Sequence, residues 1–163
     1  MKKFMLLTIM SVFLAFISRG YGHSFSTSFL TVQEQGVVKY QVSFHDLAAL
    51  NPSWLEGKPI DATLLNNHLE DIESFIQRVV VVNNSNCDLK LAESSPWSAT
   101  THANQSYIVI EAQAQCNATD IDDIEVHEVW NEFPDHRVIT QITLPGYETS
   151  QRVLSERGES ISF

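Results

Sequence analysis

The chain has 163 residues, with 10 lysines and arginines against 20 aspartates and glutamates, and a formal net charge of −10 at pH 7. A surface with this charge repels phosphate backbones, so the composition argues against a nucleic-acid-binding protein. The length fits one domain that can bury a hydrophobic core.

The first residues have the pattern of a secretory signal peptide. A basic start and an apolar run (4–17) precede Gly20-Tyr21-Gly22, which supplies the small residues that a signal peptidase reads. An uncleaved anchor is the alternative, but the run is short for a spanning helix of about 20 residues. We therefore expect cleavage after residues 1–22, a mature N-terminus at His23, and a periplasmic or secreted protein.

Cleavage would leave a mature chain of 141 residues that is more acidic than the precursor. It would carry 7 basic and 20 acidic side chains, a net charge of −13. No later stretch is long and apolar enough to cross a bilayer, so we expect no transmembrane segment in the mature chain.

The first half of the mature chain predicts a hairpin and a helix. Residues 25–32 and 37–44 are strand-like runs around a Gln-Gly turn, which indicates an antiparallel hairpin. Asp61 stands where an N-cap belongs, ahead of apolar residues that recur at three- and four-residue spacing. We expect an amphipathic helix at about 61–79, followed by a strand that begins within 79–82.

The second half of the chain predicts further strands with polar connections. The strand-like runs are 87–91, 106–116, 124–130, 138–144 and 151–154. Residues 100–106 are expected to form a polar loop and 156–163 a polar tail. Short strands at this spacing, with one early helix, predict a single β-rich domain at 23–155. Its expected fold is mainly β, an antiparallel sandwich-like, immunoglobulin-like domain with the helix inserted.

The two cysteines, Cys87 and Cys116, are expected to form a disulfide. Cysteines usually pair in an oxidising compartment, and the alternative, a metal site, would need closer spacing such as CxxC. A bridge that closes a loop of this length stabilises the fold by roughly 3.5 kcal/mol in the chain-entropy model.

The sequence contains no convincing catalytic motif. Residues 127–131 begin like the zinc-protease motif HExxH, but Asn131 stands where the second histidine is required. The sequence also lacks a GxSxG elbow, a P-loop and a GxGxxG turn, so we expect a protein that is not an enzyme.

A metal site is a separate hypothesis that depends on signal-peptide cleavage. A mature N-terminal His23 would offer an α-amine and an imidazole, which together can chelate Cu(II) or Ni(II). Asp135 and His136 could complete the site if the first strand and the loop 131–137 meet at one end of the sheets. The alternative is that His23 is an ordinary polar chain end.

Several short motifs, in order along residues 23–155, resemble those of one family. They are His23-x-x-Ser26-x-Ser28-Phe29-Leu30, Asp46-Leu47, Cys87-x-Leu89, Tyr107-x8-Cys116, Phe133-Pro134-Asp135-His136-Arg137 and Val153-Leu154-Ser155. Together they resemble the exported N-terminal region of long HupE/UreJ-type membrane proteins, a family that includes nickel and cobalt permease-like proteins. The resemblance implies an exported domain associated with membrane metal transport.

The chain also departs from that family in two respects. Family members often carry an Asp-rich, EF-hand-like segment after the hairpin, whereas residues 51–65 contain few carboxylates, so we expect no calcium there. The membrane helices that carry transport in the family are not part of this sequence, so transport itself is not carried over.

These observations predict a non-catalytic periplasmic or secreted domain. We expect it to act as an interaction or accessory module for a membrane transporter or another envelope protein. The alternative is a periplasmic nickel- or copper-binding protein that uses His23.

Overall fold

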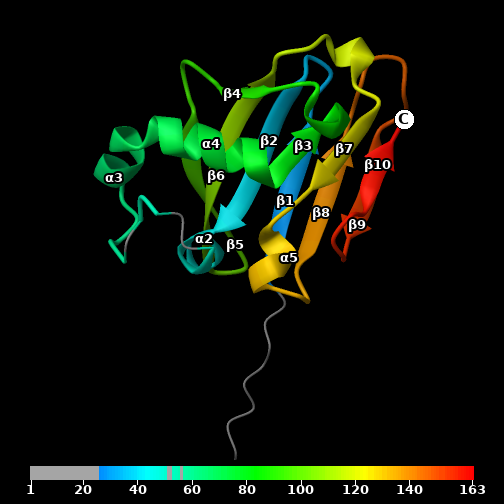
Figure 1. Ribbon diagram of the computed structural model, residues 1–163. Coiled ribbons are helices and arrows are strands. Elements are labelled where there is room, and N and C mark those ends of the chain that lie inside the picture. The colour runs from blue at the N-terminus through cyan, green and yellow to red at the C-terminus, as the bar shows by residue number, and fades with distance from the viewer. Residues whose placement is uncertain (1–25, 51–52, 56) are drawn as a thin grey trace, which may run out of the picture.

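The computed structural model describes residues 26–50, 53–55 and 57–163. They form a seven-stranded sheet and a three-stranded sheet (Figure 1). The large sheet has the strand order β4-β6-β2-β1-β8-β9, with β5 also paired to β6, and the small sheet has the order β10-β7-β3. The expected signal peptide and His23 lie outside the described residues.

The elements have the following bounds. The strands of the large sheet are β1 (Thr27–Val32), β2 (Val37–Ser43), β4 (Leu89–Leu91), β5 (Trp97–His102), β6 (Gln105–Ala114), β8 (Arg137–Ile142) and β9 (Ser150–Leu154). Those of the small sheet are β3 (Val80–Val82), β7 (Asp123–Val126) and β10 (Ser160–Ser162). The helices are α2 (Phe44–Ala49), α3 (Ala62–Asn67), α4 (Leu69–Val79), α5 (Val129–Glu132) and the 3-10 turns η1 (Asn83–Ser85) and η2 (Ala118–Asp120).

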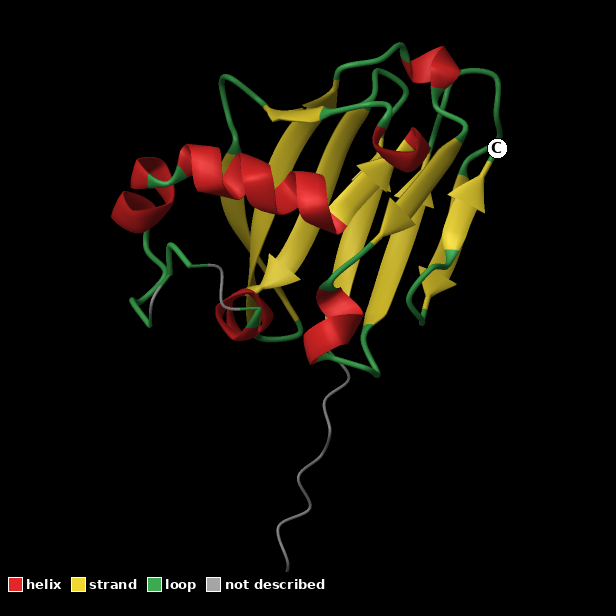
Figure 2. Ribbon diagram, in the orientation of Figure 1, coloured by secondary structure: helices red, strands yellow, loops and turns green. Residues whose placement is uncertain are grey.

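The hydrophobic core lies between the large sheet and a second layer formed by α4 and the small sheet (Figure 2). Successive strand residues point to opposite faces, so alternate residues of β1 and β2, such as Leu30 and Tyr40, are fully buried. Ile76 of α4 and Ile124 of β7 belong to the same core. The prediction of a mainly β, sandwich-like fold with one principal helix is therefore confirmed.

One strand pair differs from the antiparallel arrangement that we expected. Strands β1 and β8 are parallel, from Thr27 opposite Arg137 to Val32 opposite Ile142, so the large sheet is mixed. This pairing brings the beginnings of two strands that are distant in sequence to the same end of the sheet. The hairpin of β1 and β2 is antiparallel, as predicted.

The predicted helix at 61–79 is present but is divided into α3 and α4. Asp61 caps α3, because its Oδ1 accepts a hydrogen bond from the Leu64 amide at 2.8 Å. His68 interrupts the helix with φ −124° and ψ 34°. Its ring stacks on Trp54 with 5.7 Å between centroids, and its Nδ1 lies 2.8 Å from Asp71 Oδ2. These contacts hold His68 in a non-helical conformation within an otherwise regular apolar repeat.

Two stretches that we predicted as strands have short helices at their C-terminal ends. Helix α2 begins at Phe44 because the Ser43 hydroxyl caps it, accepting a hydrogen bond from the Asp46 amide at 2.9 Å. Strand β7 ends before Glu128, whose φ of 63° turns the chain into α5. Trp130 therefore belongs to a helix and not to the predicted strand 124–130.

The stretch 100–106, expected to be a polar loop, forms a hairpin. Strand β5 pairs with β6 through a two-residue turn at Ala103 and Asn104, where φ is 47° and 65°. Strand β5 is mostly exposed, so it lacks the alternation of buried and exposed residues that identifies a strand in sequence.

The expected polar tail at 156–163 also differs from the prediction. Residues 160–162 form β10, in which Ile161 pairs with Ile124 and is only 1% exposed. Ile161 anchors the end of the chain in the core, and the half-buried Phe163 packs beside it. None of the helices among the described residues has the length and hydropathy that a membrane crossing requires.

Candidate functional site

Four polar side chains meet at the end of the large sheet where β1 and β8 begin. Ser26 and Ser28 come from the start of β1, Asp46 from α2, and His136 directly precedes β8. The Arg137 amide donates to the Ser26 carbonyl at 2.9 Å and so aligns the two strand starts. Ser28, Asp46 and His136 are at most 2% exposed. We refer to Ser26, Ser28, Asp46 and His136 as the serine–histidine cluster.

Hydrogen bonds connect the serine–histidine cluster into one chain. The ring of His136 lies between the two serines, with Nδ1 2.5 Å from Ser26 Oγ and Nε2 2.8 Å from Ser28 Oγ. The Ser26 hydroxyl donates to Asp46 Oδ2 at 2.8 Å. Because Ser26 has one hydroxyl proton, its oxygen must accept from His136 Nδ1–H. The neutral ring therefore carries its proton on Nδ1, and Nε2 accepts from Ser28.

Burial controls protonation in this region. It lowers the pKa of His136 to about 4, although the negative charge of Asp46 acts in the opposite direction. It also raises the pKa of Tyr40 far above its usual value; Ser28 lowers that pKa slightly and Asp46 raises it. The Tyr40 hydroxyl has no hydrogen-bond partner of normal geometry among the described residues. Near neutral pH the cluster thus contains a neutral imidazole.

This geometry suits a structural role better than nucleophilic catalysis. Ser28, whose hydroxyl faces the basic nitrogen of His136, is fully buried, so a substrate could not reach it without rearrangement of the sheet. Ser26 is half-buried, but its proton is directed to Asp46. The cluster joins the first strand, α2 and β8 at one end of the domain.

The structure brings together part of the predicted metal site. The start of β1 and the loop before β8 do meet, as that hypothesis requires. His136 is buried with both ring nitrogens held by serines, so a metal ion would have to displace one of them. Asp135 is exposed, and His23 lies outside the described residues. In the part of the chain that the structure covers, no three His, Cys, Asp or Glu side chains are grouped to hold a metal; the His23 site stays a prediction.

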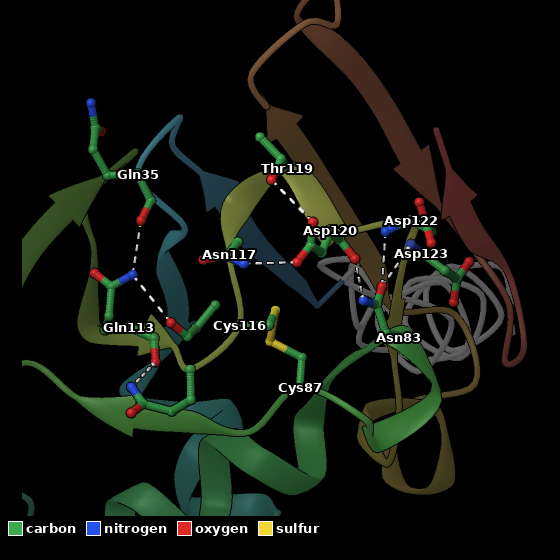
Figure 3. Close-up of a disulfide and its surroundings, with 12 residues drawn as sticks. Gln35, Asn83, Cys87, Gln113, Cys116, Asn117, Thr119, Asp120, Asp122 and Asp123 are labelled. Carbon is green, nitrogen blue, oxygen red and sulfur yellow. Dashed lines mark hydrogen bonds between the residues drawn. A yellow bond between two sulfur atoms is a disulfide. The ribbon is translucent and has the colours of Figure 1, made fainter.

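The predicted disulfide between Cys87 and Cys116 is confirmed (Figure 3). The S–S distance is 2.07 Å and the two Cα atoms are 5.5 Å apart. The bridge joins the segment after η1 to the chain just beyond β6, and Cys87 belongs to the hydrophobic core. It therefore links the two layers of the sandwich at the end opposite the serine–histidine cluster.

Beside the disulfide, Asn83 organises an acidic loop (Figure 3). Its Oδ1 accepts from the amides of Asp122 and Asp123 at 2.9 and 3.1 Å, and its Nδ2 donates to the Asp120 carbonyl at 2.6 Å. The Asp120 carboxylate accepts a further bond from Asn117 Nδ2 at 2.9 Å. These hydrogen bonds explain the conformation of the acidic loop, and we propose no ligand for it.

The outer face of the large sheet carries a line of apolar side chains. In successive strands, Val109, Phe29, Ile139 and Val153 occupy neighbouring register positions, with Gln41 between the first two. We call these four apolar residues the outer row. Ile139 is 42% exposed and Val153 is 57% exposed, although both are large and apolar. The large sheet thus has apolar side chains on both faces: the buried core on the inner face and the outer row on the open face.

Polar residues border the outer row. On one side lies the next register line, where Lys39 and Glu111 form an ion pair with 2.8 Å between Nζ and Oε2. Gln141 and Gln151 continue that line across β8 and β9. The outer face therefore presents an apolar line with a polar border along one side, while the rings of His102 and Tyr107 pack on Phe29.

A groove of about 580 Å³ lies beside β4, and three glutamates and Lys90 are its charged lining residues. Glu73, Glu93 and Glu111 contribute carboxylates to its walls. Glu73 accepts a hydrogen bond from the Leu91 amide at 2.9 Å, and Glu111 pairs with Lys39. Two of these three carboxylates are therefore already bonded within the fold.

Comparisons with known proteins add no family assignment. A scan against protein-family models and a search of curated proteins each gave no match for this chain. The functional reading therefore depends on the geometry and on the sequence motifs.

Of the serine–histidine cluster, sequence reasoning proposed only His136 as a site residue, and it did not find the outer row. Ser26, Ser28, Asp46 and His136 all occur in the short motifs described above, although nothing in the sequence indicated that they touch. The outer row could not be found, because each of its members comes from a different strand. Ile139 and Val153 look like ordinary strand residues until the strand order is known.

Proposed function

We propose that this protein is a non-catalytic exported domain that acts as an interaction or accessory module for a membrane transporter or another envelope protein. The outer row carries the proposal, through the exposed Ile139 and Val153 and the half-buried Phe29 beside them. A contiguous apolar surface with a polar border is typical of a protein-interaction site. Single exposed apolar residues are common, but Ile139 and Val153 are direct cross-strand neighbours that continue into Phe29.

The arrangement of the motif residues supports a relationship with the exported part of HupE/UreJ-type proteins. Three motifs that are far apart in sequence supply Ser26 and Ser28, Asp46, and His136. These residues converge in one hydrogen-bonded cluster. Motifs that a chain shares with a family through a common structure are expected to meet in this way, whereas chance matches are not.

The disulfide supports export. Disulfides persist in oxidising compartments such as the bacterial periplasm and are rare in the reducing cytosol. The bond between Cys87 and Cys116 is therefore compatible with a periplasmic or secreted protein whose signal peptide has been removed.

The proposal is tested by capture of the native partner from envelope fractions of the cells that make the protein. The tagged mature chain should retain one specific envelope protein, and Ile139→Lys should lose it because the lysine interrupts the outer row. Glu70→Lys, an exposed change on α4 on the opposite layer, is the matched control and should retain the partner. Equal capture by all three proteins would contradict docking through this face.

A second candidate function, nickel or copper binding through His23, is favoured by one observation. The start of β1, which follows His23 closely in sequence, lies directly beside the His136 loop, with Ser26 Oγ 2.5 Å from His136 Nδ1. Isothermal titration with Ni(II) and Cu(II) should show binding that is lost when one extra residue precedes His23. Identical titrations of the two forms would reject a chelate of amine and imidazole.

A further inference from the structure

We propose that the open edge of β9 binds an extended segment of the partner protein by strand addition, and that this segment alternates apolar and acidic residues. The inference rests on the proposed function and names how the partner would bind. It depends on the contrast between β9 and the covered edge strand β4, on the unpaired backbone groups of β9, and on the side chains that flank them.

The β4 edge of the large sheet is blocked by helix α4. Gln77 Nε2 donates to the Leu89 carbonyl at 2.7 Å, and Glu73 Oε2 accepts from the Leu91 amide at 2.9 Å. Side chains from the helix thus occupy the backbone groups with which another strand would pair. Covering an edge in this way is a common protection against unwanted strand pairing.

The β9 edge has no such cover among the described residues. The Arg152 amide and carbonyl face β8, where Thr140 Oγ1 contacts them at 3.2 and 3.1 Å. Because backbone groups alternate in direction along a strand, those of Gln151 and Val153 point away from β8. Neither residue has a hydrogen bond at this edge in the part of the chain that the structure describes. All three residues are exposed, so an incoming strand can reach them.

The side chains of β9 indicate which strand would fit. Val153 lies on the outer face and extends the outer row to the edge, so it favours an apolar residue opposite it. Arg152 points to the other face, is exposed, and makes no ion pair with another described residue. A carboxylate at the adjacent position of the incoming strand would meet this arginine. Apolar and acidic residues would therefore alternate along the added segment.

The net charge of the whole chain and the local charge of Arg152 favour opposite peptides, so a binding experiment can distinguish their effects. With a net charge of −10, the protein as a whole repels an acidic peptide and attracts a basic one. A preference for the acidic peptide would therefore have to come from the local environment of Arg152. Recognition through backbone hydrogen bonds with side-chain pairs for specificity is the usual chemistry of strand addition.

The test uses the mature chain and two fluorescent nine-residue peptides, one alternating valine with glutamate and the other valine with lysine. The glutamate peptide should bind about threefold more tightly in an anisotropy titration, as expected for one exposed charge pair. Arg152→Glu should reverse the preference. Amide shifts on binding should be largest at Gln151 and Val153.

Two further measurements test the backbone contact itself. Val153→Pro removes an amide that points away from β8 and should weaken binding about tenfold, whereas the control Val153→Thr keeps that amide and should bind nearly normally. A glutamate peptide N-methylated at alternate residues should not bind the unchanged protein, which tests the same contact without altering the fold.

The proposal is overturned if the glutamate peptide does not bind saturably, if the lysine peptide is preferred, or if N-methylation has no effect. Self-association of the wild-type chain that Val153→Pro abolishes would also overturn it, since the occupant would then be a second copy. In the capture experiment, loss of the native partner with Ile139→Lys but not with Val153→Pro would reject strand addition while the proposed function stands. Retention by both variants would reject the proposed function as well.

Discussion

Acidification should destabilise the fold through His136. The pKa of this histidine is about 4 in the folded protein because the ring is buried, against about 6.5 in an unfolded chain. Between these values the unfolded state binds one more proton than the folded state, so the free energy of unfolding decreases as the pH falls. The loss begins near pH 6.5 and is complete near pH 4, and it amounts to about 3 kcal/mol from this residue.

The variant His136→Gln isolates that contribution. Glutamine can still form hydrogen bonds with Ser26 and Ser28, but it does not titrate, while all carboxylates and the other histidines are unchanged. Urea denaturation followed by tryptophan fluorescence gives the free energy of unfolding of both proteins from pH 7 to 4. The wild type should be the more stable protein at pH 7, and its advantage should shrink by about 3 kcal/mol at pH 4. Parallel pH profiles for the two proteins would refute the buried neutral histidine.

Two other predictions concern stability. Replacing both Cys87 and Cys116 with serine should reduce the free energy of unfolding by about 3.5 kcal/mol, because the unfolded chain regains the entropy of the closed loop; reduction of the wild type should give the same loss in urea denaturation, and an unchanged midpoint would contradict it. Ala103→Gly should raise the free energy of unfolding by about 0.5–1 kcal/mol, since Ala103 has φ 47° in the turn between β5 and β6. A lower melting temperature of this glycine variant would show that the turn is not strained.

The sequence predicted an element correctly where a pattern of residues within that element identifies it. The Gln-Gly turn between two alternating runs predicted the β1–β2 hairpin, and Asp61 marked the start of the helical region. Strand β5 was missed because an exposed edge strand has no buried face and hence no alternation. The interruption at His68 was missed because the apolar repeat continues through it, and the stacking of its ring on Trp54 is a contact that no local pattern reports.

The candidate site required knowledge of the strand order. The sequence proposed His136 as a metal ligand and contained Ser26 and Ser28 in a family-like motif, but the contact among them depends on the parallel pairing of β1 with β8, which no local pattern reports. The outer row depends in the same way on register across five strands, from β6 through β2, β1 and β8 to β9. The open edge of β9 becomes apparent only when the strand order is known and α4 is seen to cover β4 at the opposite edge, where β5 is also exposed.

The central claim, that the outer face of the large sheet docks on an envelope partner, is tested most directly by photo-crosslinking in the native cells. A photoreactive benzoylphenylalanine replaces Ile139 in the outer row or, as the control, Glu70 on α4. The account predicts one specific covalent adduct with an envelope protein from position 139 and none from position 70. Adducts of equal yield from both positions, or an adduct from position 70 alone, would contradict it.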